Sequence, residues 1–503
     1  MIEYPKTNSF KKDFTTPIED LRRKELLDFY KKKVVAHYTG LQNISAENIP
    51  NLQATGEMPI FTPYDATRGE LKLLPVEMVA EAMVKRHIHI QTIVHPERIA
   101  RLKEKEITTF SPAPPKKIPL LKKFKKKHVA VSFADLGFMP VDNMDDGGVS
   151  ATENLSSFWS WATKKTVALP YILASTPDGD SAWSIATMAI CQGLGFIPVD
   201  SIWSKVENQI IMAKRIFELI DSEPALIGHP DEEYLKSRAK SLVGATLKAN
   251  PKDAEIRAQE LYNAGIRTFR VYDARTKGGA MVETVKKLRD MFGDTVTIIA
   301  GQVINPDQAI GLQEAGADAI VIGIGEGGIC KTPKEASLVA SNVMAGYKIA
   351  KKGLNIPLIF DSGVGPRTPV AIALGGGAVM KSQALVGSVI EKPPFCWWWW
   401  NKGRYESQYS GEAAERTKHL GHKVGPDGEP TFVEGVDEVT YFNEEVPSIA
   451  SNIYYLLQSL VTASVFQRVG DLDDLRLLKK VKLWTQTGNA VYSTGVHHNG
   501  SKQ

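Results

Sequence analysis

A repeated strand–turn–helix pattern constrains this chain more than any other feature. From residue 131 onward, short apolar runs alternate with Gly/Asp/Pro turns and amphipathic helical segments. The runs with strand character are Ala168–Ala174, Gly195–Val199, Leu242–Leu247, Thr268–Asp273, Val296–Gly301, Asp318–Ile324, Pro357–Asp361 and Gly377–Ser382. The helical patterns are Trp183–Cys191, Ile202–Ile220, Ala254–Asn263, Met281–Met291, Asp307–Ala315, Glu335–Lys351 and Pro369–Leu374. Strands that alternate with helices in this way predict an α/β fold with a parallel sheet.

Eight such strands in series predict a closed (β/α)₈ TIM barrel, whose usual size is about 250 residues. An open doubly wound sheet is the alternative, but eight consecutive units favour closure. The crossover after the eighth strand is crowded by tryptophan and proline and has no clear helical pattern.

Residues 1–110 are predicted to form an additional N-terminal accessory module of α+β type. Apolar residues recur at helical spacing in Pro17–Val34 and again in Val76–Arg86. The alternation in His87–Ile90 then predicts a short strand. The role of this module does not follow from the sequence.

Residues 111–129 are rich in proline and lysine, which disfavours helix and predicts a linker. Its basic run Lys116–Lys127 has no accompanying aromatic residues for base stacking and is read as a solvated tether. Residues 130–503 are then the barrel with its flap and C-terminal tail. The apolar periodicity of Ser448–Val469 predicts a helical appendage to the barrel.

Composition narrows the functional classes. The chain has 61 Lys and Arg against 57 Asp and Glu, a formal net charge of +4, so no nucleic-acid partner is expected. Three cysteines exclude a disulfide scaffold and favour a reducing compartment. We expect no transmembrane helix and no signal peptide, which together predict a cytoplasmic protein without a membrane partner.

In TIM barrels the chemistry takes place where the strands end, on the loops that lead into the helices. The most informative of these loops is Gly323–Thr332, in which glycines allow close approach to a ligand and Cys330 stands beside Lys331. A Gly-rich turn with an incidental cysteine is the alternative interpretation. The loops after the last two strands, Asp361–Gly365 and Lys381–Ser382, occupy the usual phosphate-binding position and favour a functional site.

Within those two loops, hydroxyls, a backbone amide and a cation suit a nucleotide phosphate: Ser362, Gly363, Lys381 and Ser382. Asp361, at a strand end, is placed to accept hydrogen bonds from ribose hydroxyls. The alternative makes Asp361 a helix cap and Lys381 a solvated residue at the rim.

The order and spacing of these loops resemble the IMP dehydrogenase/GMP reductase family, from Val131 to Leu475. Gly323–Thr332 resembles its loop with the catalytic cysteine, Ile359–Gly365 its ribose-aspartate loop, and Gly377–Ser382 its phosphate loop. The resemblance implies a purine nucleotide substrate, an NAD or NADP cofactor and a homotetramer.

The resemblance also assigns roles to single residues. Cys330 would attack C2 of the purine, with Thr332 and Glu434 relaying protons. Tyr409 would join the substrate-binding residues. The cofactor would contact Asp273, Gly301, Gln302, Gly323 and Gly325. In some members, carbonyls at the positions of Gly325, Gly327 and Cys330 bind K⁺.

Two reactions are implied. An IMP dehydrogenase, the leading interpretation, oxidises IMP to XMP with NAD in purine nucleotide biosynthesis, whereas a GMP reductase converts GMP to IMP with NADPH. The chain differs from the family in having Gly328-Ile329 before the cysteine, Gln302 in place of an asparagine, and no clear water-activating Arg-Tyr pair. An FMN-dependent barrel oxidoreductase and a non-catalytic nucleotide-binding barrel are the remaining alternatives.

Two smaller features stand apart from the motifs. His87, His89 and His95 have a spacing that would suit a metal, but without a further ligand a half-buried strand is favoured. The four tryptophans Trp397–Trp400 cannot all be buried on one face, so some must meet another surface. That surface is the N-terminal module, a second subunit or a ligand, and packing against the module or a subunit is favoured.

Overall fold

The computed structural model describes much of the chain, including most of the predicted barrel. The described residues are 17–62, 65, 68–105, 132–133, 136–138, 161–162, 168–169, 172–174, 181–273, 278–326, 330–335, 337, 340–361, 368–374, 376–381, 387–421, 425–431, 433–467 and 483–485. The predicted linker 111–129 and its basic run Lys116–Lys127 lie outside them.

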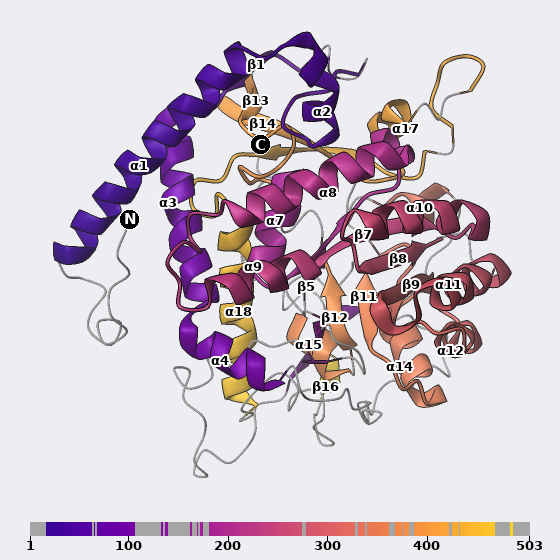
Figure 1. The fold of residues 1–503 in the computed structure, drawn as a ribbon. Coiled ribbons are helices and arrows are strands. Elements are labelled where there is room, and N and C mark those ends of the chain that lie inside the picture. The colour runs from indigo at the N-terminus through magenta and orange to yellow at the C-terminus, as the bar shows by residue number, and fades with distance from the viewer. Residues whose placement is uncertain are drawn as a thin grey trace.

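Eight parallel strands close into a barrel, which confirms the predicted fold (Figure 1). They are β5 (Ile172–Ala174), β6 (Leu194–Ile197), β7 (Val243–Lys248), β8 (Thr268–Tyr272), β9 (Thr297–Val303), β10 (Ala319–Ile322), β11 (Leu358–Asp361) and β12 (Gly376–Met380). Pairing of β12 with β5 completes the ring, so the barrel has no open edge. The first predicted strand is divided, since its beginning forms β4 (Ala168–Leu169), which pairs with β3 (Trp161–Ala162) outside the barrel.

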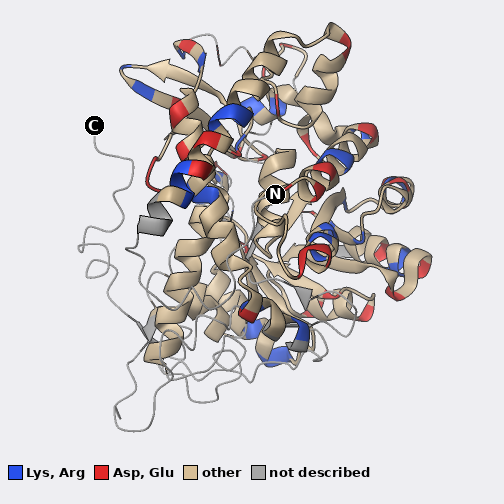
Figure 2. Cartoon of the chain, turned by 60° about the vertical axis from the view of Figure 1, so that its left-hand side comes forward, with Lys and Arg blue, Asp and Glu red and all other residues tan. Residues whose placement is uncertain are grey.

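Helices surround the barrel between its strands. They are α7 (Ala182–Ile190), α8 (Val206–Asp221), α9 (Glu232–Ser241), α10 (Pro251–Asn263), α11 (Gly278–Phe292), α12 (Pro306–Glu314), α13 (Thr332–Glu335), α14 (Asn342–Lys352) and α15 (Thr368–Ala373), with short 3₁₀ turns at Ser201–Ser204 and Gly293–Thr295. Polar caps set several starts: Ser181 makes a capping box at α7, and the Asn250 side chain accepts from the backbone N–H of Lys252 at α10. Figure 2 shows charges of both signs interspersed on the outer helices.

The helix predicted over Glu335–Lys351 is two helices, α13 and α14. The Ser341 side chain caps α14 by accepting a hydrogen bond from the backbone N–H of Met344, which ends the intervening turn. Gly353 ends α14 in the left-handed conformation, with φ of 93°.

The N-terminal segment is mainly helical. It contains α1 (Pro17–Gln42), a 3₁₀ turn at Ala46–Asn48, α2 (Ile49–Ala54), β1 (Glu70–Leu73), α3 (Val76–Ile93) and α4 (Pro96–Lys105). The strand predicted for His87–Ile90 is wrong, because these residues continue α3. Their side chains have separate partners: His87 Nδ1 lies 2.8 Å from Tyr30 Oη, and His89 Nδ1 lies 2.9 Å from Ser451 Oγ.

The four tryptophans form a strand, β13 (Trp397–Asn401). It lies between β1 of the N-terminal segment and β14 (Arg404–Ser410), in a four-stranded sheet that ends with β15 (Asp437–Tyr441). Trp398 is only 1% exposed and packs with Val34 and Val79 of the N-terminal helices. Packing on the N-terminal segment, one of the two favoured interpretations, therefore accounts for the tryptophan strand.

The C-terminal part supplies α17 (Glu415–Leu420), α18 (Ile449–Phe466) and β16 (Leu483–Thr485), which pairs with β2 (Leu136–Phe138). The predicted helical appendage is α18. Among the described residues α18 alone is long and apolar enough, by length and composition, to cross a membrane. It packs against α3 and α7, and its Ile453 and Leu460 are buried in the main core.

A buried ion network joins α3 to the barrel. Arg86 donates to both oxygens of Glu223, at 3.1 and 2.8 Å, and its Nε lies 3.2 Å from Oε1 of Glu391. Thr187 of α7 accepts a further bond from Arg86 at 2.8 Å. All of these side chains are buried, so the network attaches the N-terminal segment firmly to the barrel.

Candidate functional site

The three predicted chemical residues meet at the barrel mouth. Cys330 Sγ donates a hydrogen bond to Thr332 Oγ1 at 3.1 Å, and Thr332 Oγ1 donates to Glu434 Oε2 at 2.8 Å. The cysteine is half-buried, so a ligand can reach its thiol. A thiol, a hydroxyl and a carboxylate in series can pass a proton from sulfur to oxygen.

Backbone contacts hold Glu434 in this position. The backbone N–H of Lys331 donates to the Glu434 carbonyl at 2.6 Å, and Cys330 and Gly435 form an isolated antiparallel bridge. From the other side, the carbonyl of Ala413 accepts from the backbone N–H of both Glu434 and Gly435, each at 3.1 Å. Three separate chain segments therefore build the thiol–carboxylate arrangement.

Asp361, the predicted ribose ligand, is at the end of β11 and already has protein partners. Arg270 of β8 lies 3.7 Å from its Oδ2, and the Gln302 amide donates to the same oxygen. The Asn342 amide donates to the Asp361 carbonyl at 2.9 Å. Both Asp361 and Arg270 are nearly buried, so a ribose hydroxyl has to share this carboxylate with the protein.

Two of the glycines predicted to contact a cofactor are required by the barrel itself. A Cβ on Gly301 would lie 2.3 Å from the carbonyl oxygen of Val321, and one on Gly323 would lie 2.6 Å from that of Asp361. Both have positive φ, 149° and 140°. Gly325 also has a positive φ, of 84°.

The remaining predicted residues are placed at the same end or lie outside the described part. Asp273 follows β8, Lys381 follows β12, and Tyr409 is buried in β14. Burial lowers the pKa of Lys381 to about 8, so an anion beside it would be favourable. Ser362, Gly363, Gly327 and Ser382 lie outside the described residues.

A charged cluster at the barrel mouth was missed in the sequence. Lys248 Nζ, at the end of β7, lies 2.5 Å from Asp200 Oδ2 and 3.3 Å from Glu412 Oε1. Burial, with the neighbouring Asp200 carboxylate, raises the pKa of Glu412 to about 7. Burial opposes the charge of Lys248, but the two carboxylates outweigh it and raise its pKa. The sequence feature that could have indicated this cluster is Lys248, a lysine at the end of a barrel strand.

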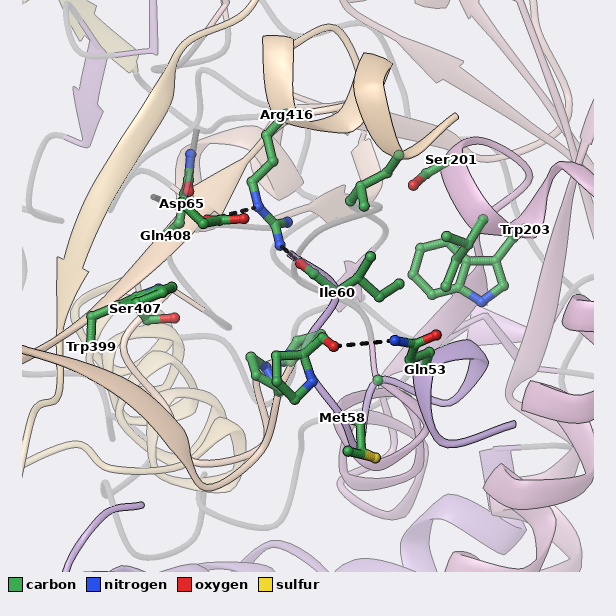
Figure 3. A pocket seen from close by; sticks show the side chains of 16 residues that line it. Gln53, Met58, Ile60, Asp65, Ser201, Trp203, Trp399, Ser407, Gln408 and Arg416 are labelled. Atoms are coloured by element: carbon green, nitrogen blue, oxygen red, sulfur yellow. Dashed lines mark hydrogen bonds and ion pairs between the residues drawn. The ribbon is translucent and has the colours of Figure 1, made fainter. Parts of the chain in front are cut away.

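A small pocket of about 60 Å³ lies between the N-terminal segment, the loop after β6 and the C-terminal part (Figure 3). The N-terminal segment contributes Gln53 and Ile60, the loop after β6 contributes Trp203, and the C-terminal part contributes Trp399 and Arg416. None of the predicted site residues lines it. In the described part of the chain this pocket is therefore a junction between three segments, separate from the thiol.

The closed parallel barrel and its thiol–hydroxyl–carboxylate arrangement define the class: a TIM barrel in which a thiol is joined to a carboxylate through a hydroxyl at the C-terminal mouth. The family model for the IMP dehydrogenase / GMP reductase domain matches residues 151–497. The chain belongs to this family.

Individual relatives are similar over shorter stretches. The inosine-5'-monophosphate dehydrogenase of Staphylococcus haemolyticus is 33% identical over 151 residues, 29% of this chain and 31% of the relative. That of Mycobacterium tuberculosis is 33% identical over 31% of this chain and 29% of its own length. That of Vigna unguiculata is 27% identical over 54% of this chain and 53% of the relative. The chain thus matches about a third to a half of the length of these relatives.

Proposed function

We propose that the chain is an NAD-dependent oxidoreductase of IMP dehydrogenase type, which converts IMP to XMP through a covalent adduct on Cys330. The observation that carries this proposal is the series of hydrogen bonds from Cys330 through Thr332 to Glu434. The arrangement connects a nucleophile to a base through one intervening hydroxyl, which allows the thiol to lose its proton as it adds to an electrophilic carbon.

The Cys330 thiol loses its proton through Thr332 to Glu434 as sulfur bonds to C2 of the purine. The hydride then leaves C2, and NAD supplies the acceptor for it. Glu434 releases the thiol proton to solvent, and water then adds to C2 of the resulting thioimidate while passing one proton through Thr332 to Glu434. The C2–sulfur bond breaks to release XMP. Sulfur recovers a proton from the same relay, so the site returns to its starting state.

Asp361 and Lys381, at the ends of β11 and β12, support a nucleotide site at this mouth. Asp361 would accept bonds from the substrate ribose, and Lys381 would meet its phosphate with Ser362, Gly363, Ser382 and Tyr409. Asp273, one strand from Gln302, would bind a ribose of NAD, since a carboxylate at a strand end suits vicinal hydroxyls. The backbone carbonyls of Gly325, Gly327 and Cys330 would bind K⁺. A rate of turnover that does not depend on the K⁺ concentration would argue against this cation site.

A GMP reductase using NADPH is the second candidate, because the sequence from Glu412 to Val433 contains no Arg-Tyr pair to activate water. A barrel that binds nucleotides without catalysis is the third. The reductase would use the same Cys330 relay, with ammonia leaving C2 and hydride arriving.

A thermal-shift panel of IMP, XMP, GMP, NAD and FMN, followed by an assay at the nicotinamide absorbance band, separates these candidates. Stabilisation by IMP with NADH formed from IMP and NAD supports the dehydrogenase. NADPH consumption with GMP supports the reductase, and nucleotide binding without either change supports a non-catalytic barrel. A yellow preparation stabilised by FMN would favour the flavin alternative. Measurement of the molecular mass in solution tests the expected tetramer. Cell fractionation tests the expected cytoplasmic location.

A further inference from the structure

The segment between β14 and the end of α17, residues 411–420, links three parts of the molecule and is called here the bracket. Its first residues follow Tyr409 and Ser410 of β14, and its last turn is α17. Within it the carbonyl of Ala413 accepts from the backbone N–H groups of Glu434 and Gly435. The position of the bracket therefore determines where the Glu434 side chain meets Thr332.

The barrel holds the beginning of the bracket by an ion pair. Lys248 Nζ reaches Glu412 Oε1 at 3.3 Å and Asp200 Oδ2 at 2.5 Å. Asp200 is only 4% exposed, whereas Lys248 and Glu412 are 36% and 32% exposed, so solvent screens the Lys248–Glu412 pair in part. Glu412 immediately precedes Ala413, and so the attachment acts one residue from the carbonyl that holds Glu434.

The N-terminal segment holds the other end. Arg416 Nε lies 3.5 Å from Asp65 Oδ1, and Arg416 Nη2 donates to the Ile60 carbonyl at 3.0 Å (Figure 3). Asp65 is itself fixed, since the backbone N–H and the hydroxyl of Thr62 donate to its Oδ2 at 2.7 and 2.9 Å. Both charged side chains are largely buried, at 13% and 5% exposure.

The backbone transmits these restraints over a short distance. Gly435 allows the close approach, because a Cβ there would lie 2.9 Å from the Ala414 nitrogen. The Gly411 carbonyl accepts from the Thr417 hydroxyl at 2.8 Å, which ties α17 back to the start of the bracket. The bracket is thus a braced turn between the N-terminal segment and Glu434.

We propose that Arg416 and Lys248 are positioning residues, and that the N-terminal segment acts through the Asp65–Arg416 pair to hold Glu434 against Thr332 and Cys330. This inference gives the N-terminal segment a role in the thiol site. Only the expected effect on turnover rests on the proposed function. The positioning role itself can be tested without any nucleotide, because the reactivity of the Cys330 thiol can be measured directly.

The test measures the rate at which iodoacetamide alkylates Cys330, followed by mass spectrometry of its peptide. Arg416→Ala and Lys248→Met are expected to slow alkylation about fivefold to tenfold, the effect of one lost hydrogen bond. Arg416→Lys, which keeps the charge, should recover part of the rate. In a Glu434→Gln background, Arg416→Ala should cause no further loss, because both changes interrupt the same relay.

The matched control is Arg215→Ala. Arg215 pairs with Glu57 of the same N-terminal segment at 2.7 Å but anchors it to α8 instead of the bracket. Alkylation in this variant should match the wild type. An unchanged rate in folded Arg416→Ala, an equal loss in Arg215→Ala, or a full further loss in the Glu434→Gln background would overturn the inference. Thermal unfolding checks that each variant folds. If Arg416→Ala does not fold, Lys248→Met and Arg416→Lys are used for the test instead.

Failure of the proposed function gives a different result. A wild-type protein that forms no NADH from IMP but whose Cys330 alkylation falls on Arg416→Ala retains the positioning role without the dehydrogenase reaction. If turnover is present, kcat should fall with alkylation while KM for IMP changes little, because the bracket acts on the relay.

Discussion

Thr332 donates its hydroxyl to Glu434 across 2.8 Å, although the two residues are 102 positions apart in the chain. The same hydroxyl accepts from Cys330, so it is the only side chain between thiol and carboxylate in this series. We expect Thr332→Val, which keeps the shape but removes the hydroxyl, to lower kcat about a hundredfold. Thr332→Ser is the control and should retain most of the rate. Steady-state assays of NADH formation measure both, and equal rates for the valine and serine variants would exclude a relay through Thr332.

Glu434 is the proton acceptor at the end of this relay, and its substitution should affect catalysis but not substrate binding. Glu434→Gln removes the base but preserves size, so kcat should fall by about two to three orders of magnitude while the thermal shift caused by IMP is retained. Combining Glu434→Gln with Thr332→Val should lower kcat little more than either change alone, because both interrupt the same proton path. Multiplying losses in the double variant would show two independent roles.

Glu391 should contribute stability that is lost as pH rises from about 4.5 to about 7. Burial raises the pKa of Glu391 from 4.5 to about 7, despite the nearby Arg86 charge. The folded protein therefore holds a proton that the unfolded chain releases above about pH 4.5, and the contribution is lost as pH rises through 7. Its full size, reached below about pH 4.5, is about 3 kcal/mol.

The measurement is the free energy of unfolding by denaturant from pH 5 to pH 8. Relative to the wild type, Glu391→Gln should gain stability as pH rises, because the other groups with shifted pKa values, Glu412, His87 and His89, are common to both proteins. Glu81→Gln, in an exposed pair with Arg23, is the control and should leave the pH dependence unchanged. A slope equally steep in wild type and Glu391→Gln would contradict the assignment.

The tryptophan strand should contribute unequally to stability. Trp398 is 1% exposed and its ring meets that of Phe442 edge-on at 5.5 Å, whereas Trp400 is only half-buried. Trp398→Ala should therefore destabilise by about 3–5 kcal/mol, and Trp400→Ala by clearly less. Denaturant unfolding of the two variants checks this order. A larger loss at Trp400 would indicate that the β13–β1 sheet does not pack through Trp398.

The barrel was predictable because each strand is a continuous apolar run with a turn after it, such as Leu242–Leu247, and the order of these runs specifies the ring. The prediction of a strand at His87–Ile90 was wrong, because a run of only four residues is compatible both with the two-residue period of a strand and with the 3.6-residue period of a helix. Only the contacts of α3 decide it: His87 faces Tyr30, while His89 stacks on Tyr454 at 4.5 Å.

The site was predictable where motifs carry it and not where distant charges meet. Cys330, Thr332 and Glu434 were assigned from the resemblance, and the structure brings them into one series of hydrogen bonds. Nothing in the sequence pairs Lys248 with Glu412, which are 164 positions apart. Such pairs depend on which strand ends face one another, and that is set by closure of the barrel.

The central claim is that turnover passes through a covalent bond to Cys330, and the most direct test is the rate of NADH formation by Cys330→Ala with IMP and NAD. If Cys330 forms the covalent bond, this variant should show no rate above background, together with a thermal shift on adding IMP equal to that of the wild type. A variant that binds IMP and turns over at the wild-type rate would contradict it.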